Sequence, residues 1–216
     1  MTDTRTAPAP FAGNLAEPPA LPEESIAAAN RLLGAGKLFR YVESGEAVAE
    51  AALLEDEFAA LMGAHYCVGA NSGGGALFLA LKAAGVIPGD PVLVNAFTLA
   101  PVPGAIAHAC ARPVLVDITA DLVIDLDDLA AKARETGAKV LLLSHMRGHL
   151  ADLDAVEAVC EAHGLTLIED CAHTTLARWG DRLAGRVGRA GCFSAQSYKH
   201  LNGGEGVLLV TDDADL

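Results

Sequence analysis

Short runs of valine and leucine alternate with helix-like segments through most of this sequence. Four runs are each followed by a segment of helical periodicity, and three more runs come after them. The runs lack the polar alternation of a half-exposed strand, so we expect strands that are buried on both faces. The pattern predicts an α/β fold with three αβα layers, in which helices cover a mostly parallel sheet of about seven strands. The predicted strands are residues 66–70, 91–95, 113–117, 139–145, 165–170, 192–196 and 206–212.

The N-terminal part of the chain has a different texture. Residues 1–22 are rich in alanine and proline and predict a flexible arm. Residues 23–36 predict a helix that ends on glycine, and residues 44–64 predict a longer helix with Ser44 as its cap. We expect a single domain over residues 23–216.

Composition limits the classes of function. With 216 residues and 52% apolar content the chain can bury a sizeable core, and no apolar stretch reaches the length of a membrane span. The N-terminus lacks the basic and apolar parts of a secretory signal, so we expect the cytoplasm. A net charge of −13 argues against nucleic acids and anionic membranes as partners, although a local pocket can still hold a small anion.

The cysteines form no C-x-x-C pair, and most of them stand within apolar runs. This usage favours reduced core thiols over disulfides or zinc ligands, so we expect no metal site. The five residues are Cys67, Cys110, Cys160, Cys171 and Cys192.

The loop after the first predicted strand is a candidate anion site. In open parallel sheets, ligands bind at the carboxyl ends of the strands, and here Ser72, Gly73 and Gly74 lead from a strand into a helix. Small residues leave the amide groups of the helix N-terminus open to a phosphate, and the Ser72 hydroxyl adds a donor. The spacing matches neither a P-loop nor a dinucleotide fingerprint, which weakens a nucleotide interpretation. A tight turn without a ligand is the alternative.

Two carboxylates end the fifth predicted strand. Glu169 and Asp170 close a buried apolar run, and His173 follows three residues later. A carboxylate at the end of a central strand loses solvation and needs a cationic or hydrogen-bond-donating partner. The alternatives are a helix cap for the acids and a structural, partly buried position for the histidine.

Lys199 follows the sixth predicted strand and precedes a Gly-Gly-Glu-Gly segment. Considered alone, it is most simply a solvated loop charge. Together the three loops offer what pyridoxal 5′-phosphate (PLP) requires. The phosphate needs an anion site, the pyridine nitrogen needs a carboxylate, and the aldehyde needs an amine for a Schiff base.

The sequence resembles the DegT/DnrJ/EryC1/StrS family, PLP-dependent sugar aminotransferases with the aspartate aminotransferase fold (fold type I). The resemblance runs from about Tyr66 to the last residue. It is carried by the segments "SGGGALFLALKAAGVIPGDPVLV", "ARPVLVDI", "LIEDCAH", "GCFSAQSYKHLNGGEG" and "LVTDD".

The resemblance implies a role for each matching residue. Lys199 is expected to form the Schiff base and to act as general base, so its replacement should abolish turnover. Asp170 is expected to pair with the pyridine nitrogen. Of the remaining positions, His173 matches a Gln or His near the ring, Ser194 a serine at the phosphate, and Gly73 and Gly74 the phosphate turn.

Several positions depart from the family pattern. Many members carry a bulky aromatic on the cofactor ring where this chain has Leu99, so either Phe97 stacks on the ring or Leu99 holds it. Gly74 stands where a threonine is usual, which removes a hydroxyl donor. Arg147 replaces an aromatic residue, and it either pairs with a substrate carboxylate or faces solvent.

The chain stops just after the last predicted strand. By resemblance, we expect residues 23–216 to form the PLP-binding large domain and the smaller C-terminal domain to be absent. A truncated gene, a split protein or a deliberately shortened chain would all give this sequence, and the activity of the isolated chain is in question.

Three functions follow from the resemblance. The first is an aminotransferase that passes nitrogen from glutamate or glutamine to a keto group on a sugar nucleotide or a cyclitol. The second is a sugar dehydratase, which is weakened because those members have histidine at the position of Lys199. The third is a truncated or degenerate copy that binds PLP or a partner chain without turnover. Family members build active sites from two subunits, so we expect a homodimer.

Overall fold

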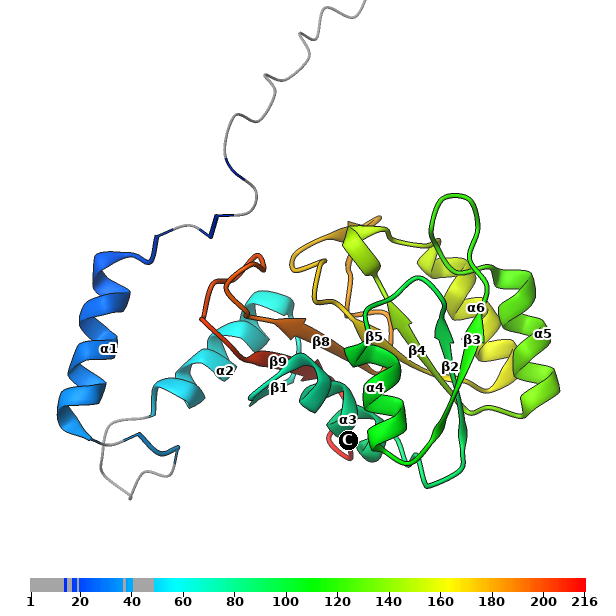
Figure 1. The fold of residues 1–216 in the computed structure, drawn as a ribbon, viewed down its shortest axis with the longest axis horizontal. Coiled ribbons are helices and arrows are strands. Elements are labelled where there is room, and N and C mark those ends of the chain that lie inside the picture. Colours follow the sequence, from blue (N-terminus) through cyan, green and yellow to red (C-terminus); the bar gives the residue numbers. More distant parts are fainter. Residues whose placement is uncertain (1–13, 15–16, 19, 37, 41–48) are drawn as a thin grey trace, which may run out of the picture.

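The computed structural model describes residues 14, 17–18, 20–36, 38–40 and 49–216, and its centre is a seven-stranded sheet (Figure 1). The strands are β1 (Tyr66–Ala70), β2 (Pro91–Asn95), β3 (Arg112–Val116), β4 (Val140–Ser144), β5 (Thr166–Asp170), β8 (Ala190–Ser194) and β9 (Val207–Thr211). Two short strands, β6 (Arg178–Trp179) and β7 (Arg182–Leu183), form a separate hairpin.

The strand order is β1-β9-β8-β5-β4-β2-β3. Every neighbouring pair from β8 to β3 is parallel, and β9 is antiparallel to both β8 and β1. The prediction of a mostly parallel sheet of about seven strands is therefore confirmed. Six of the strands point the same way, so their carboxyl ends lie at one edge of the sheet, where such folds bind ligands.

Helices cover both faces of this sheet and complete the three predicted layers (Figure 1). The helices are α1 (Glu23–Ala35), α2 (Glu50–Met62), α3 (Gly73–Ala83), α4 (Pro101–His108), α5 (Leu126–Thr136) and α6 (Leu153–His163). Along β2, Val92 and Val94 pack with α3 and α4, whereas Leu93 between them packs with α5 and α6. Along β8, Phe193 packs with α2 on the same face as α5 and α6.

The expectation that all strands are buried on both faces is wrong for the two edge strands. In β1, Tyr66 is 47% exposed and Val68 49% exposed, and in β3 Leu115 is 54% exposed. An edge strand has a neighbour on one side only, and the covering helices reach it incompletely. Burial on both faces holds for the central strands β4, β8 and β9, in which every residue is buried.

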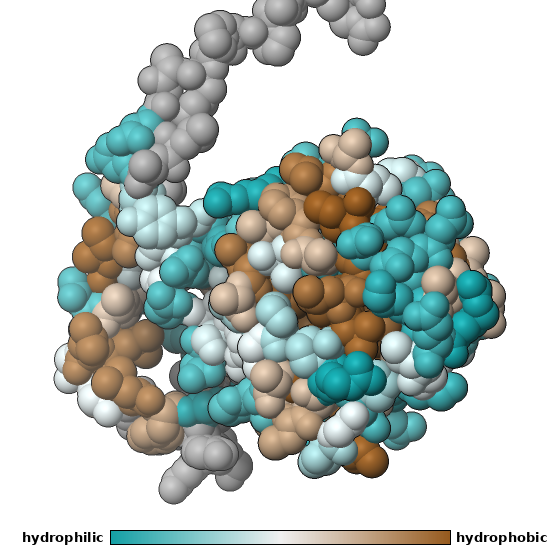
Figure 2. Space-filling view, turned by 45° about the vertical axis from the view of Figure 1, so that its right-hand side comes forward, coloured by the Kyte–Doolittle hydropathy of each residue, from teal (hydrophilic) through white to brown (hydrophobic). Residues whose placement is uncertain are grey.

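The N-terminal helices differ in how they join the body. Helix α1 begins at Glu23 as predicted and ends at Gly36, which is left-handed with φ 69°, yet none of its residues is buried. Figure 1 shows α1 apart from the sheet, and Figure 2 shows apolar residues on it. Helix α2 begins at Glu50 with Ala49 as its cap, later than predicted, and the predicted cap Ser44 lies outside the described residues. Most of the predicted arm, residues 1–22, also lies outside them.

The structure also describes the cysteines and the length of the helices. All five cysteines are free, and three of them, Cys160, Cys171 and Cys192, are buried. Among the helices that the structure describes, none is both long enough and apolar enough to span a bilayer.

Candidate active site

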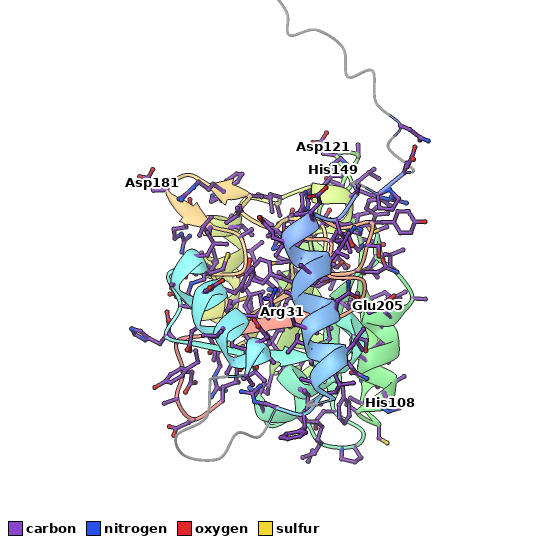
Figure 3. All side chains as sticks on the ribbon, turned by 90° about the vertical axis from the view of Figure 1, so that its left-hand side faces the viewer. Arg31, His108, Asp121, His149, Asp181 and Glu205 are labelled. Atoms are coloured by element: carbon purple, nitrogen blue, oxygen red, sulfur yellow. The ribbon has the colours of Figure 1, made fainter. Side chains whose placement is uncertain are left out.

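One cavity of about 470 Å³ opens at the carboxyl edge of the sheet, next to the ends of β1, β5 and β8. Figure 3 shows at which end of the molecule this edge lies. His149 follows β4 and Asp121 follows β3, and both lie at one end of the molecule, while His108 at the end of α4 lies toward the other. The cavity is lined by predicted site residues from three separate loops, namely Ser72, Gly73, Gly74, Asp170, Ser194 and Lys199.

The glycine turn forms an open helix N-terminus. Ser72 caps α3, because its Oγ accepts the N–H of Gly75 at 3.1 Å. A Cβ on Gly75 would lie 2.9 Å from Asn71 Oδ1, so a side chain there would force Asn71 to move. A Cβ on Gly73 would meet nothing within 4 Å, and the first amides of a helix have no partner inside it. The turn therefore presents free N–H groups and space to an anion, while the Ser72 oxygen serves the helix and its O–H proton stays available.

Asp170 lies at the end of β5 and lines the cavity. One carboxylate oxygen accepts the hydroxyl of Ser144 at 2.8 Å, and the other accepts the N–H of Ala172 at 3.2 Å. A turn and the β6–β7 hairpin follow β5, so Asp170 is not the cap of an α-helix in the described chain. Two donors leave acceptor capacity on this carboxylate for a ligand.

Lys199 is half-buried, and its Nζ lies 2.7 Å from Nε2 of His173. It is therefore not a solvated loop charge. Nδ1 of the same histidine ring accepts the backbone N–H of Arg147 at 3.3 Å. A neutral imidazole has one N–H and one acceptor nitrogen. With Nδ1 as the acceptor, the proton of a neutral ring lies on Nε2 and faces the Lys199 amine, an arrangement that disfavours the ammonium form of Lys199.

Charge and burial act in the same direction as this geometry. Burial lowers the pKa of Lys199, and the positive charge of Arg147 lowers it further against the opposing effect of Asp170. Burial, followed by the charge of Lys199, lowers the pKa of His173. An amine with a lowered pKa is unprotonated, and therefore nucleophilic, at a lower pH than an ordinary lysine.

A comparison with known proteins now assigns the family, since the sequence profile of the DegT/DnrJ/EryC1/StrS aminotransferase family matches residues 20–216. The chain belongs to this family. The spore coat polysaccharide biosynthesis protein SpsC of Bacillus subtilis is 40% identical over 163 residues, which is 75% of this chain and 42% of SpsC. The L-glutamine:scyllo-inosose aminotransferase of Streptomyces griseus is 41% identical over 160 residues, which is 74% of this chain and 38% of that enzyme.

The fold comparison agrees with the sequence comparison. The crystal structure of the aminotransferase from Psychrobacter cryohalolentis superposes with a TM-score of 0.83 at 27% identity, over 92% of this chain and 49% of that one. This chain therefore spans half or less of the length of these three relatives.

Leu99 and Phe97, the two residues that the family resemblance places at the cofactor ring, differ in position. Leu99 lines the cavity and is 41% exposed. Phe97 is not among the residues that line it, and its ring instead meets His149 edge to face, with centroids 6.4 Å apart. Ser194, at the phosphate position of the family, is buried at the end of β8, and its Oγ accepts the N–H of Gln196 at 3.3 Å.

Glu169 directly precedes Asp170 in β5 but does not line the cavity. It points into the core with no exposed surface and meets Nε2 of the buried His145 at 2.9 Å. The same carboxylate accepts the N–H groups of Gly185, Val187 and Gly188 at 2.7 to 2.9 Å. Burial alone would raise the pKa of Glu169, but the hydrogen bonds and the charge of His145 outweigh it and lower the pKa.

Sequence reasoning expected no metal, yet one trio of possible ligands comes together. Atoms of His145, Glu169 and Cys171 lie within 4.8 Å of one another in the core. The carboxylate of Glu169 already accepts its full set of donors, and burial raises the pKa of the Cys171 thiol well above its ordinary value. Within this trio, the His145 ring and the Glu169 carboxylate form a buried hydrogen bond.

Sequence reasoning missed Ser144, Gln196 and Glu205 in this region. Ser144 holds the Asp170 carboxylate, and the other two line the cavity. Ser144 had a signal that could have found it, since it ends β4 beside β5, where parallel strands align their last residues.

Proposed function

We propose that this chain carries the PLP site of an aminotransferase that moves an amino group from glutamine or glutamate to a keto group of a sugar nucleotide or cyclitol. The observation that carries the proposal is the Lys199 amine, held 2.7 Å from His173 in the loops around the cavity that Asp170 and the glycine turn also line. Membership of the family supports the reaction class.

The residues around the cavity fit PLP. A cavity of about 470 Å³ is in the range of cofactor sites. We assign the phosphate to the amides of Gly73 and Gly74, with the hydroxyls of Ser72 and Ser194 as further donors. When bound, PLP supplies an electron sink that stabilises negative charge on the substrate carbon.

The remaining assignments concern protons and the ring. We assign the pyridine N–H to Asp170, whose negative charge keeps the ring nitrogen protonated. The amine of Lys199 is the nucleophile and later the base that accepts the substrate proton at Nζ. The Nε2–H of His173 disfavours the protonated form of that amine. Leu99 is assigned to the ring face, because Phe97 does not line the cavity.

The substrate classes follow the relatives. The Streptomyces griseus relative is named for L-glutamine as donor and scyllo-inosose, a cyclitol ketone, as acceptor, and the Bacillus subtilis relative for polysaccharide biosynthesis. We extend the donor and the keto-sugar or cyclitol class of acceptor to this chain.

Domain organisation and assembly belong to the same proposal. We propose that residues 23–216 are the PLP-binding large domain, that the protein works in the cytoplasm, and that two copies pair. Exposed apolar side chains on α1, including Ile26 and Leu33, support pairing, because a monomer gains nothing from leaving them in water. Light scattering during size-exclusion chromatography tests the pairing, and a monomer at all concentrations would contradict it.

The test of the proposed function is a titration of the protein with PLP, followed by absorbance, beside Lys199→Ala and the control Lys139→Ala. Lys139 is exposed and distant in sequence from the cavity residues. We expect a visible absorbance band in the wild type and the control, lost on adding L-glutamine, and no such band in Lys199→Ala. Equal spectra for all three proteins would refute the assignment of Lys199, and a band that ignores every amino donor would point to a copy that binds PLP without turnover.

A further inference from the structure

Arg147 has an unusual backbone conformation beside Lys199. It lies in a 3₁₀ turn (Met146–Gly148) after β4, with φ 57° and ψ 18°, a left-handed conformation that non-glycine residues rarely adopt. The turn is fixed on both sides. The N–H of His145 donates to the Asp170 carbonyl at 3.1 Å, and the N–H of Arg147 donates to His173. An unfavourable conformation that is fixed to two site residues orients the arginine relative to them.

The guanidinium of Arg147 is exposed and available. Within the described residues it makes no ion pair and no hydrogen bond, although the protein carries a net charge of −13. Four other arginines are neutralised by acids, namely Arg40 by Glu55, Arg182 by Asp154 and Glu157, Arg186 by Asp212, and Arg189 by Asp213. Among the described residues, Arg31, Arg112 and Arg134 form no ion pair either. An exposed guanidinium without a partner among the described residues is free to receive an anion.

The positive charge of Arg147 acts on the amine of Lys199. It contributes to the lowered pKa of both Lys199 and His173, and the exposed His200 adds positive charge near His173. This cationic side of the site differs from the phosphate turn. Arg147 follows β4, the turn follows β1, and three strands separate these two in the sheet. Arg147 is also not among the residues that line the cavity together with the turn.

We infer that Arg147 binds a carboxylate of the substrate and so contributes to substrate selection. The inference rests on the proposed function, because the substrate must react at Lys199, one contact away through His173. A planar guanidinium matches a carboxylate with two parallel hydrogen bonds, which an aromatic residue at this position cannot do. The amino donor, an amino acid, always carries a carboxylate next to its reacting carbon, and an acid group on the acceptor is the other source.

The test compares Arg147→Gln and Arg147→Lys with the wild type in the cofactor-loaded full chain. The control is Arg134→Gln, which removes an exposed arginine at the end of α5. Binding of glutarate, a dicarboxylate that cannot react, is measured by calorimetry. We expect glutarate to bind about 10- to 100-fold more weakly to Arg147→Gln, with an intermediate loss for Arg147→Lys and none for the control. The affinity for PLP and the melting temperature should not change.

Two further arms separate the sources of the carboxylate. L-Glutamate is titrated in the donor half-reaction, and scyllo-inosose and a keto sugar acid are titrated in the acceptor half-reaction. Weaker binding of L-glutamate in Arg147→Gln assigns the carboxylate to the donor, and weaker binding of the keto acid alone assigns it to the acceptor. Unchanged binding of every probe overturns the inference. Failure of the proposed function is a different result, because PLP would then give no Lys199-dependent band in any of these proteins.

Discussion

Glu169 and Asp170 are neighbouring carboxylates at the end of β5, and they have opposite surroundings. Glu169 points into the core and accepts His145 and three backbone N–H groups. Asp170 lines the cavity and, among the described residues, accepts hydrogen bonds from Ser144 and Ala172 alone. A carboxylate has about four acceptor positions, so Glu169 is saturated by the protein and Asp170 is not. We therefore propose that unused hydrogen-bonding capacity, and not burial or charge alone, marks Asp170 as the residue that meets a ligand.

The largest expected effect is at Asp170, whose acceptor positions are not all filled. Asp170→Asn keeps the shape of the side chain but removes the charge assigned to the pyridine nitrogen. We expect turnover to fall about 10³-fold, the size of effect seen when one preorganised electrostatic group is removed, with little change in stability. Steady-state kinetics and thermal unfolding measured on the same preparation check this. A variant that loses stability but keeps its turnover would break the comparison.

Replacing Glu169, whose acceptor positions are filled, should instead affect stability more than PLP binding. Glu169→Gln turns one acceptor into a donor among four donors and removes the negative charge from a buried hydrogen-bonded pair with His145, so we expect a loss of about 3 kcal/mol in the free energy of unfolding. Urea denaturation measures it. PLP affinity of the folded variant should stay near the wild-type value, because Glu169 does not line the cavity. Strong loss of PLP binding without loss of stability would contradict this assignment.

Ser72 is an intermediate case that sharpens the comparison. Its oxygen is used by the helix cap, while its O–H proton is free for the phosphate. Ser72→Ala should therefore cost about 1 kcal/mol of stability through the lost cap. It should also weaken PLP binding, whereas Ser72→Thr keeps both the cap and the donor and should restore them. Equal PLP affinity in Ser72→Ala and the wild type would remove Ser72 from the phosphate site.

The smallest expected effect is a shift in titration. Burial and Arg147 lower the pKa of Lys199 below its ordinary value of 10.5, so reductive labelling of this amine should reach half its maximum at a lower pH than for an exposed lysine. Removing a positive charge favours the ammonium form, so Arg147→Gln should move the midpoint upward. A downward shift would show that the sign of this interaction is wrong. Labelling yields at a series of pH values, read by mass spectrometry, provide the measurement.

Local patterns in the sequence were enough to predict much of the fold and the loops of the candidate site. The glycine turn after β1 and the apolar runs of β2, β4 and β5 were predictable, because strand ends and helix caps depend on adjacent residues. The antiparallel direction of β9 and the exposed edge strands were not, since strand order depends on contacts between distant segments.

The pair contacts of the site also lay beyond local reasoning. Lys199 and His173 are 26 residues apart, and the Arg147 amide that fixes the histidine comes from a third segment. The sequence could not separate Glu169 from Asp170 either, because β5 is apolar on both faces and gives no sign of which side each carboxylate takes. Only the packing of the core under β5 decides that Asp170 faces the cavity.

The most direct test of the central claim is borohydride reduction of the protein with PLP, followed by digestion and mapping of the label. The chain has five lysines, Lys37, Lys82, Lys132, Lys139 and Lys199, which serve as internal controls for one another. The account predicts one pyridoxyl group, on Lys199, and none on the other four. Label spread over several lysines, or label that is unchanged in Lys199→Ala, would contradict it.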